Sequence, residues 1–450
     1  MYFNDLASIS QRLPLLPNSS DWNLALRRLV PYQVQGRVCA LQGGVIAVEG
    51  LPLSVGAVTR IDRQGHGYME AEVIGFQGDK TLLAPFDVLE GVRAGDRVEL
   101  VHSSRCVRVS MELCGRVLDA KGAAIDGGEP IRAGKRVYCD ASAATALSRQ
   151  PIKSPIPTGV RAIDTLMSLG QGQRIGVFSA AGVGKSTLLG MLARGTQADC
   201  VVIGLIGERG REVRDFLEND LGPEGRSKAI TVVATSDQPA PRRILAAKTA
   251  TAIAESLRDQ GKSVLLLMDS LTRFATAQRE IGLAAGEAPT TRGYPTSVFS
   301  SLSQLVERAG NNARGSITAI YTILVEADDN NEPISDAVRG FLDGHIILSK
   351  ALADSGHYPA IDVLRSLSRL QQQLLDPKQI ALGGQLRKWM AIYDEHRELI
   401  QIGAYRSGSN PQMDRAIALK PIFDAFLTQA TDQIVPWKES WEALSQLIRN

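Results

Sequence analysis

The 450-residue chain lacks most of the features that would assign it to a specialised class. Its five cysteines contain no C-x-x-C pair, and its five histidines are scattered without metal-ligand spacing. The absence of these spacings excludes a disulfide scaffold and a zinc site, and it indicates reduced thiols in a cytosolic protein. A charge excess is also lacking, because 50 basic residues face 48 acidic ones, so nothing global favours nucleic acid or anionic lipid as a partner.

Long apolar runs are missing as well. No run approaches the length of a membrane span, and the start MYFNDLASIS lacks the basic and then apolar layout of a secretory signal. We therefore expect the protein to stay in the cytoplasm. The composition, with 44% hydrophobic and 22% charged residues, is typical of a globular chain. Its length is enough for about three domains.

The most informative stretch is RIGVFSAAGVGKST, residues 174–187, which predicts a strand, a loop of small residues and the start of a helix. Gly182 and Gly184 allow backbone N–H groups to point inward at a polyphosphate. Lys185 adds a cation for the outer phosphates, and the hydroxyl of Ser186 is a ligand for Mg²⁺. The nucleotide-binding residues predicted in this loop are Ala181, Gly182, Val183, Gly184, Lys185, Ser186 and Thr187.

This loop departs from the G-x-x-x-x-G-K-[ST] pattern at one position, where Ser179 replaces the first glycine. The alternative for the stretch is a small-residue turn in an ordinary strand-to-helix unit. Residues 174–350 alternate strand-like apolar runs with helical ones, which predicts a parallel sheet with helices on both faces. Ligands of such sheets bind beyond the carboxyl ends of the strands, so the residues that follow the apolar runs are candidates for chemistry.

Two carboxylates follow such runs. Asp269 ends the aliphatic run 264–268 and is predicted to hold Mg²⁺ together with Ser186, because this cation prefers oxygen ligands. Glu208 follows the run 201–206, where a carboxylate can polarise the water that attacks the γ-phosphate. The alternatives are a helix cap for the first carboxylate and a solvated charged turn for the second. Pairing with the phosphate loop favours the catalytic interpretation of both.

Basic and aromatic side chains complete the predicted site. Arg209 and Arg211 are expected to keep the Glu208 carboxylate ionised, and either can also reach a phosphate or a neighbouring subunit. Arg369, in the segment PAIDVLRSLSRL, is a candidate to stabilise charge on the γ-phosphate in the transition state. Tyr358 offers a flat surface to adenine, although an aromatic residue beside a proline is more often plain packing.

The sequences on either side of this core differ from it in character. Residues 32–100 hold short β-like runs separated by glycines, which predicts a small antiparallel barrel or sandwich. Residues 101–160 are rich in glycine and proline and resemble a connection more than an element. Residues 376–450 show helical spacing. Within residues 1–30, a short capped helix has two interpretations, docking to a partner or membrane surface and packing on its own domain.

Together these motifs resemble a known family. SAAGVGKST, GLIGERGREVRDFLE, LLLMDSLTRFATAQREIGLAAGE and GHYPAIDVLRSLSR resemble the ATPases of type III protein export, which are similar to the α and β subunits of rotary ATP synthases. The resemblance covers residues 32–430. The run GERGRE, which contains Glu208, is typical of the export ATPases and makes the chain similar to a catalytic member. DSLTRFATAQREIGLAAGE and LIQIGAYRSGSNPQMDRAI look more like the flagellar branch than the virulence injectisome branch.

The resemblance implies an α/β fold with a RecA-like P-loop NTPase core, a small N-terminal β-barrel and a C-terminal helical domain. It also implies a homohexameric ring in which each active site lies between subunits and Arg369 acts in trans on the neighbour's nucleotide. We accordingly expect a partner-binding segment, a barrel, an ATPase domain and a helical domain, with the boundaries 1–30, 31–100, 101–375 and 376–450.

The implied function is hydrolysis of ATP, with Mg²⁺, by a motor ATPase that energises type III protein export through chaperone release and substrate unfolding. Implied partners are peripheral and central stalk proteins, export chaperones and substrates, and a membrane export gate contacted at the inner face of the cell membrane. The alternatives are an injectisome ATPase, a structural ring subunit without turnover and an RNA translocase. Glu208 argues against the second alternative. Residues 32–100 offer few aromatic side chains for RNA, so no nucleic acid is expected.

Overall fold

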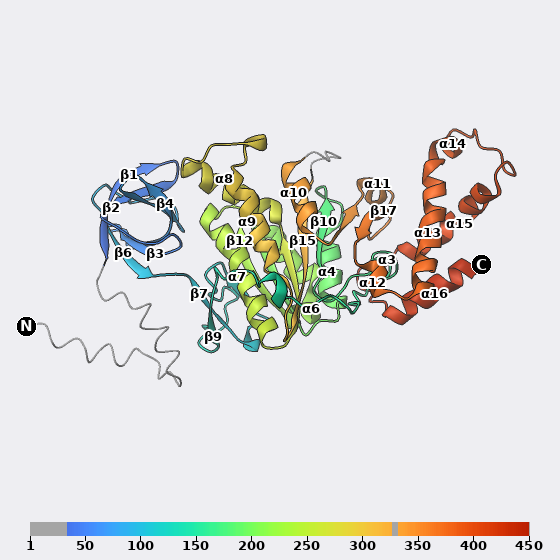
Figure 1. Ribbon diagram of the computed structural model, residues 1–450, viewed down its shortest axis with the longest axis horizontal. Coiled ribbons are helices and arrows are strands. Elements are labelled where there is room, and N and C mark those ends of the chain that lie inside the picture. Colours follow the sequence, from blue (N-terminus) through green and yellow to red (C-terminus); the bar gives the residue numbers. More distant parts are fainter. Residues whose placement is uncertain (1–33, 326–331, 450) are drawn as a thin grey trace, which may run out of the picture. The chain divides into compact units, whose positions relative to one another are not determined.

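The structure is a computed structural model that describes residues 34–325 and 332–449 (Figure 1). The described chain divides into two compact units, the first ending at Ser104 but leaving out Phe86–Val88, which belong to the second. The short helix predicted within residues 1–30 lies outside the described residues. The boundaries predicted at residues 100 and 375 stay predictions.

The first unit is a closed barrel of antiparallel strands in the order β1-β2-β5-β4-β3-β6. Alternate residues of a strand point to opposite faces, and accordingly Met69, Ala71 and Val73 of β4 are fully buried. The barrel predicted by the sequence is confirmed. Its strands are β1 (Gln35–Gln42), β2 (Val45–Glu49), β3 (Val58–Asp62), β4 (Tyr68–Gln77), β5 (Lys80–Pro85) and β6 (Arg97–His102).

The second unit is built on one sheet in the order β17-β16-β10-β15-β13-β11-β12-β8, with β14 paired to β15. The pairs are parallel except β16 with β17 and β14 with β15. The strand-like runs of the alternating pattern form strands of this sheet, among them 201–206 and 264–268. The strands are β8 (Val117–Asp119), β10 (Arg174–Ser179), β11 (Cys200–Glu208), β12 (Ala229–Thr235), β13 (Ser263–Asp269), β14 (Gly310–Asn311), β15 (Ser316–Leu324), β16 (Gly344–Leu348) and β17 (Ile361–Ser368).

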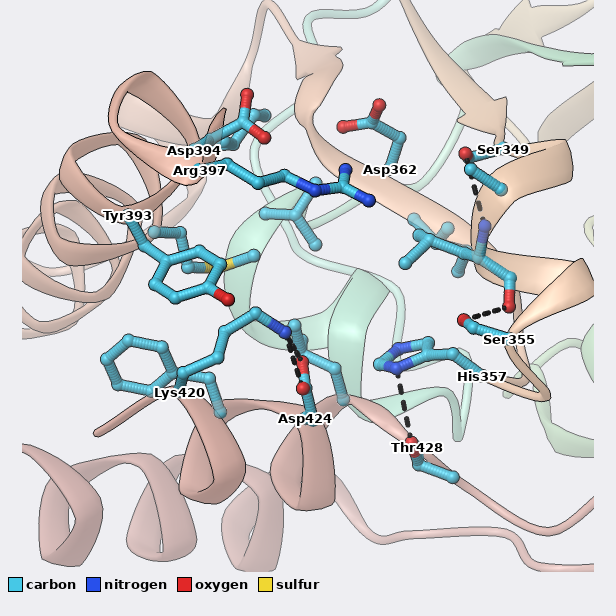
Figure 2. A pocket seen from close by; sticks show the side chains of 18 of the residues that line it. Ser349, Ser355, His357, Asp362, Tyr393, Asp394, Arg397, Lys420, Asp424 and Thr428 are labelled. Carbon is cyan, nitrogen blue, oxygen red and sulfur yellow. Dashed lines mark hydrogen bonds and ion pairs between the residues drawn. The ribbon is translucent and has the colours of Figure 1, made fainter. Parts of the chain in front are cut away.

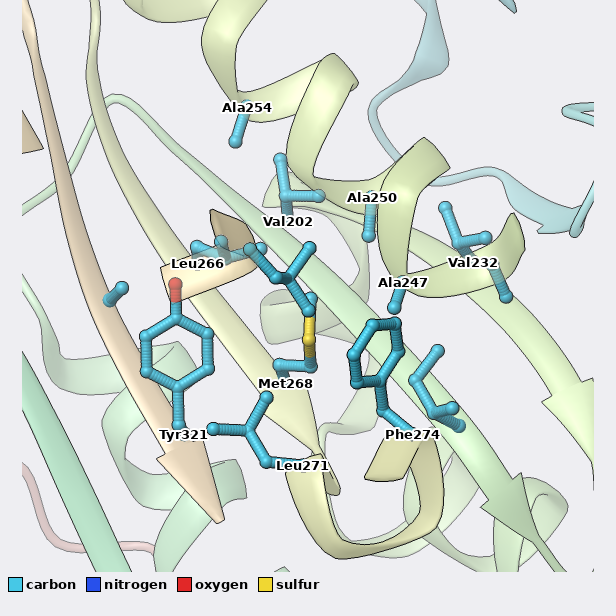
Figure 3. Packing of buried hydrophobic residues seen from close by; sticks show 14 of the residues in the cluster. Val202, Val232, Ala247, Ala250, Ala254, Leu266, Met268, Leu271, Phe274 and Tyr321 are labelled. Atoms are coloured by element: carbon cyan, nitrogen blue, oxygen red, sulfur yellow. The ribbon is translucent and has the colours of Figure 1, made fainter. Parts of the chain in front are cut away.

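Helices cover both faces of this sheet, as the alternating pattern predicts. Leu266 and Met268 of β13 belong to one buried cluster, whereas Leu265 and Leu267 belong to the other, because successive side chains leave opposite faces. Figure 3 shows the first cluster, where Met268 packs near Phe274. Its helices are α7 (Ala240–Asp259), α8 (Leu271–Ala284), α9 (Thr296–Glu307) and α10 (Pro333–Phe341).

The opposite face packs against the helix that follows the phosphate loop, and the same buried cluster continues into helices near the C-terminus. Trp389 stacks on Phe423 with ring centroids 6.2 Å apart, which joins two of the C-terminal helices. The helices of this cluster are α3 (Arg161–Leu166), α4 (Lys185–Gly195), α13 (Pro377–Glu395), α15 (Pro411–Leu427) and α16 (Trp437–Arg449). Short helical segments complete the unit: α5 (Gly210–Asp215), η3 (Phe216–Asp220), α6 (Gly222–Lys228), α11 (Lys350–Asp354), α12 (Gln371–Leu374) and α14 (Arg397–Gln401).

The Gly- and Pro-rich passage of residues 101–160 contains more structure than its composition indicates. Its strand β8 forms an edge of the main sheet, where Val117 pairs with Thr231 of β12. A second pair, β7 (Cys106–Val109) with β9 (Lys135–Tyr138), forms a separate two-stranded sheet. Strands of three or four residues are too short to produce a periodic pattern, and their partners lie far along the chain.

Within residues 34–325 and 332–449, no helix combines the length and the apolar character that crossing a membrane requires.

Candidate active site

Strand order brings three predicted groups to the same edge of the sheet. The phosphate loop follows β10, Asp269 ends β13 and Glu208 ends β11. These strands run parallel, with β15 between β10 and β13, so their carboxyl ends lie together. This is the edge at which ligands bind in open α/β sheets.

The phosphate loop has the backbone that an anion site requires. Gly182 and Gly184 have φ angles of +78° and +84°, in the left-handed region that favours glycine. Gly184 is the N-cap of α4, and no side chain caps this helix. The first helical hydrogen bond runs from the Leu188 N–H to the Gly184 carbonyl, at 3.0 Å. The N–H groups of the first turn are therefore left for a ligand, at the positive end of the helix.

An aromatic ring lies beside this loop. A side-chain Cβ placed on Gly184 would lie 3.4 Å from Cε1 of Tyr358, so the ring approaches the loop backbone closely. Tyr358 is 40% exposed, which leaves much of its ring accessible to a ligand. Contact of this ring with adenine stays a prediction, and its position next to the phosphate loop is compatible with that role.

Three ionisable side chains meet at the loop. Lys185 Nζ lies 2.5 Å from Asp269 Oδ1 and 3.7 Å from Glu208 Oε1. All three are largely buried, with exposed side-chain fractions of 12%, 5% and 13%. The sequence predicted each of them separately, and the structure brings them within contact of one another. One cation faces two carboxylates, so the cluster has capacity for a further cation.

Burial and charge set the protonation of this cluster. Burial, reinforced by the negative charge of Asp269, raises the pKa of Glu208 to about 7. Burial alone would favour neutral Lys185, but the Asp269 and Glu208 carboxylates outweigh it and raise the pKa of this ammonium group. The lysine is therefore charged at neutral pH, and the glutamate is balanced between its two states.

The arginines near Glu208 are not those that the sequence indicated. Arg209 pairs with Glu212 at 3.4 Å, and Arg211 is likewise exposed and paired on its own helix. Besides the phosphate-loop lysine, the cation that favours ionised Glu208 is Arg273 of α8. The ion pairs of Arg209 and Arg211 in the described chain are with Glu212 and Asp215, so the expectation that they hold this carboxylate ionised stays a prediction. A contact of Arg209 with phosphate stays a prediction.

Buried oxygen atoms test whether these residues fit a nucleotide with its cation. Glu208 Oε1 and Ser179 Oγ are buried and have no hydrogen-bond partner among the described residues. Buried polar atoms are rarely left unpaired without a functional reason. Ser186 is half-buried in the first turn of α4, the position from which a hydroxyl can join Asp269 at a hard cation. The residues present therefore fit a phosphate chain accompanied by a divalent cation and a water.

Arg369 is not brought into this cluster. It follows the end of β17, and its guanidinium donates to the carbonyl of Arg339 at 3.4 Å. No contact recorded for the described chain joins Arg369 to Lys185 or Glu208. Within a single chain it is therefore separate from the phosphate site.

A cavity of about 590 Å³ lies elsewhere in the second unit, between β17, α11 and the helices α13 to α15 (Figure 2). It is lined by charged and aromatic side chains, among them Arg397, Tyr393 and the ion pair of Lys420 with Asp424. None of the predicted catalytic or nucleotide-binding residues lines it. The assignment of the active site therefore rests on the phosphate-loop cluster.

The structure adds two residues that sequence reasoning missed. Arg273 faces Glu208 from α8, and Thr322 of β15 donates its hydroxyl to Asp269 Oδ1 at 2.6 Å. Arg273 lies in a helix and Thr322 in a strand, and the sequence of each element is typical of that element. Nothing in the local sequence therefore marks either residue as part of a site. The order of the strands, which the sequence does not contain, was needed to find them.

Comparisons with known proteins agree with this geometry. Residues 159–368 match the ATP synthase alpha/beta family, nucleotide-binding domain, and residues 375–446 match the T3SS EscN ATPase C-terminal domain. The chain is 49% identical over 428 residues to the flagellum-specific ATP synthase of Treponema pallidum, which covers 95% of this chain and 96% of that protein. It is 48% identical over 435 residues to the type 3 secretion system ATPase of Xanthomonas euvesicatoria, with coverages of 96% and 98%.

Solved structures give the same result. The assembled ATPase EscN from the enteropathogenic E. coli type III secretion system has a TM-score of 0.86 and 42% identity, over 92% of this chain and 100% of that chain. EscN in complex with its central stalk EscO has a TM-score of 0.84 and 41% identity, with the same coverage. The similarity therefore extends well beyond the nucleotide-binding domain.

Proposed function

The chain belongs to the flagellar and type III secretion ATPases of the ATP synthase α/β family, and from this premise we propose that it hydrolyses ATP·Mg²⁺ in a homohexameric ring to energise the export of flagellar proteins. The observation that carries the proposal is the meeting of Lys185, Asp269 and Glu208 at an uncapped helix start. This arrangement supplies a phosphate cradle, a cation ligand and a base in one place.

The roles of these residues follow from their positions. The N–H groups of the α4 first turn and the ammonium group of Lys185 hold the phosphates, and Tyr358 lies where a base can contact it. Ser186 and Asp269 hold Mg²⁺, which when bound neutralises charge on the β- and γ-phosphates. Glu208 orients the attacking water and accepts its proton, a task for which a pKa of about 7 is well suited.

Assembly into a ring completes the site. Arg369 makes no contact with the phosphate cluster of its own chain, so its proposed partner is the nucleotide of the neighbouring subunit. Similarity to EscN, solved as an assembled ATPase and in complex with its central stalk EscO, supports a homohexamer with a central stalk protein for this chain. We extend the proposal to a peripheral stalk protein, export chaperones and substrates, and a peripheral position at the inner face of the membrane beside the export gate.

The flagellar branch is preferred over virulence secretion because of the segments around Asp269 and residues 399–417, although relatives of the two names are 49% and 48% identical. Deletion of the gene distinguishes the branches. We expect loss of motility and of filament assembly with normal secretion of virulence effectors, and the reverse outcome would assign the chain to an injectisome.

Hydrolysis itself is tested with Glu208→Gln. The amide keeps the volume of the side chain but cannot accept the proton of the attacking water, so turnover should fall by about 10² to 10⁴-fold. Binding of a fluorescent ATP analogue should persist, because Lys185 and the loop backbone are unchanged. Phosphate release and analogue binding are measured together.

The matched control for this substitution is Glu218→Gln, which removes an exposed carboxylate of the same type, paired with Arg214. Its turnover should equal that of the parent protein. A parental rate in Glu208→Gln would refute the assignment of the base. Absence of phosphate release from the unsubstituted protein, with or without RNA homopolymer, would instead support a structural ring subunit.

A further inference from the structure

A threonine on the strand between the phosphate loop and Asp269 extends the proposed site. We infer that Thr322 is a positioning residue, whose hydroxyl holds the Asp269 carboxylate in place for Mg²⁺ when Lys185 turns from Asp269 to the phosphates. This inference rests on the proposed function, because it assigns a further residue to the same cation site. Thr322 itself touches neither nucleotide nor metal.

The sheet order places Thr322 where it can do this. β15 lies between β10, which leads into the phosphate loop, and β13, which ends at Asp269. Thr322 is in register with Val177 of β10 and is completely buried. Its Oγ1 lies 2.6 Å from Asp269 Oδ1 and 3.5 Å from the carbonyl oxygen of Met268. The hydroxyl donates to the ionised carboxylate, which can only accept.

Asp269 Oδ1 has two donors, and only one of them is free to leave. Lys185 Nζ, at 2.5 Å, belongs to a long flexible side chain that must turn to the phosphates of a nucleotide. Thr322 is β-branched, which restricts its χ1 angle, and its backbone is fixed in the interior of the sheet. When the lysine leaves, the threonine hydroxyl is the donor that remains.

Retention of this donor matters because Asp269 is only 3% exposed. A buried carboxylate that loses its hydrogen bonds is costly and changes rotamer or protonation to avoid that cost. With Oδ1 held by Thr322, the carboxylate keeps its place at the end of β13 and stays available to the proposed cation. Outer partners of metal ligands commonly contribute 10- to 100-fold in metal affinity, roughly.

A purely structural hydroxyl on the same strand provides the matched control. Thr318 lies four residues before Thr322, on the same face of β15, and is equally buried. Its Oγ1 accepts a hydrogen bond from the Gly172 N–H at 2.9 Å, away from the phosphate loop. Both threonines therefore satisfy a buried polar partner, but only Thr322 has a partner that changes its bonding during the reaction.

The experiment is a Mg²⁺ titration of ATPase activity at fixed ATP for Thr322→Val, Thr322→Ser and Thr318→Val, with melting temperatures measured for all. Valine keeps the volume but removes the hydroxyl, so half-saturation in Mg²⁺ should shift upward about 10- to 100-fold in Thr322→Val. Serine should restore the parental value. Thr318→Val should lower the melting temperature without a change in the Mg²⁺ requirement.

The affinity for ATP measured with excess chelator should be the same in Thr322→Val and the parent protein, because the lysine and the loop backbone are unchanged. If Thr322→Val does not fold, the same titration is made with Thr322→Ala, which also lacks the hydroxyl and has a smaller side chain. A parental Mg²⁺ requirement in the folded variant, or an equal shift in Thr318→Val, would overturn the inference. That result leaves the proposed function standing, whereas an inactive parent protein overturns the function itself.

Discussion

At the scale of single residues, the site is organised by one lysine between two carboxylates. Lys185 forms an ion pair with Asp269, the group proposed to hold Mg²⁺. Under the proposed function, nucleotide exchanges this ion pair for two others, lysine with phosphate and carboxylate with cation. The exchange conserves charge-charge contacts inside a low-dielectric site, so little is lost when the lysine moves.

Glu208 gives the activity a defined dependence on pH. The base works when ionised, and burial with the Asp269 charge raises its pKa to about 7, so kcat/KM should fall as the pH drops below 7 and level off above it. Removal of a neighbouring cation raises the pKa of Glu208 further. In Arg273→Gln, the acidic limb of the profile, where kcat/KM falls, should therefore move to higher pH. The measurement is kcat/KM from pH 5.5 to 9 with Mg²⁺ in excess.

The control for this profile is Arg214→Gln, which removes an exposed guanidinium paired with Glu218. Its limb should coincide with that of the parent protein, because the charge is screened by solvent. A flat profile between pH 6 and 8, or a limb unmoved in Arg273→Gln, would contradict the assignment of Glu208 as the titrating base.

At the scale of elements, the helix that follows the phosphate loop is seated by a glycine. A Cβ on Gly190 of α4 would lie 2.4 Å from the carbonyl oxygen of Asp220, at the end of η3. The side chain of Asp220 also bonds Thr187 in the first turn of α4. The helix whose N-terminus faces the ligand is therefore held against a second helical segment at backbone distance.

Gly190→Ala tests this contact. Alanine raises helix propensity by up to about 1 kcal/mol, but overpacking against backbone costs typically about 1 to 3 kcal/mol, so we expect a net loss of stability. Displacement of α4 should also weaken nucleotide binding. Denaturant unfolding and analogue binding measure the two effects.

Gly384→Ala is the control, since it lies inside α13 and has nothing within 4 Å of an added Cβ. The gain in helix propensity is then not opposed by overpacking, so the free energy of unfolding should rise by up to about 1 kcal/mol. Equal effects at the two glycines would show that the approach of α4 to Asp220 does not determine the loop position.

At the scale of the whole molecule, the proposed function requires a second chain to complete the site. Its phosphate cluster lies at the β10, β13 and β11 ends, whereas Arg369 follows β17 at the edge of the sheet, where its guanidinium donates to the carbonyl of Arg339. A guanidinium exposed at a sheet edge can serve the active site of another subunit. Under this arrangement, turnover depends on assembly and nucleotide binding does not.

Arg369→Ala should leave nucleotide binding intact and lower turnover by about 10³-fold or more. Mixing provides the sharper test. Arg369→Ala subunits keep an intact phosphate loop, and Lys185→Ala subunits keep an intact Arg369, so mixed rings should recover hydrolysis that neither variant shows alone. Phosphate release is measured against the mixing ratio, and a mixture as inactive as its components would indicate that the arginine does not act in trans.

The sequence predicted those parts of this protein that are encoded over short distances. The small residues before Lys185, the aliphatic runs and the carboxylates that end two of them are local patterns, and each produced the element or position expected. The barrel was predicted from short β-like runs separated by glycines, and the helices after residue 376 from a period of 3.6 residues, which reflects the buried face. By itself, the sequence therefore determined the fold class and the identity of the catalytic candidates.

The tertiary structure decided what depends on the lateral order of strands. No local pattern states that β15 separates β10 from β13, since parallel pairing joins segments far apart in the chain. That order places Thr322 on Asp269 and closes the contact between Lys185 and the two carboxylates, while Arg209 pairs with Glu212. Distances and pKa values at the site arise from this packing, because burial and charge act through space and not along the chain.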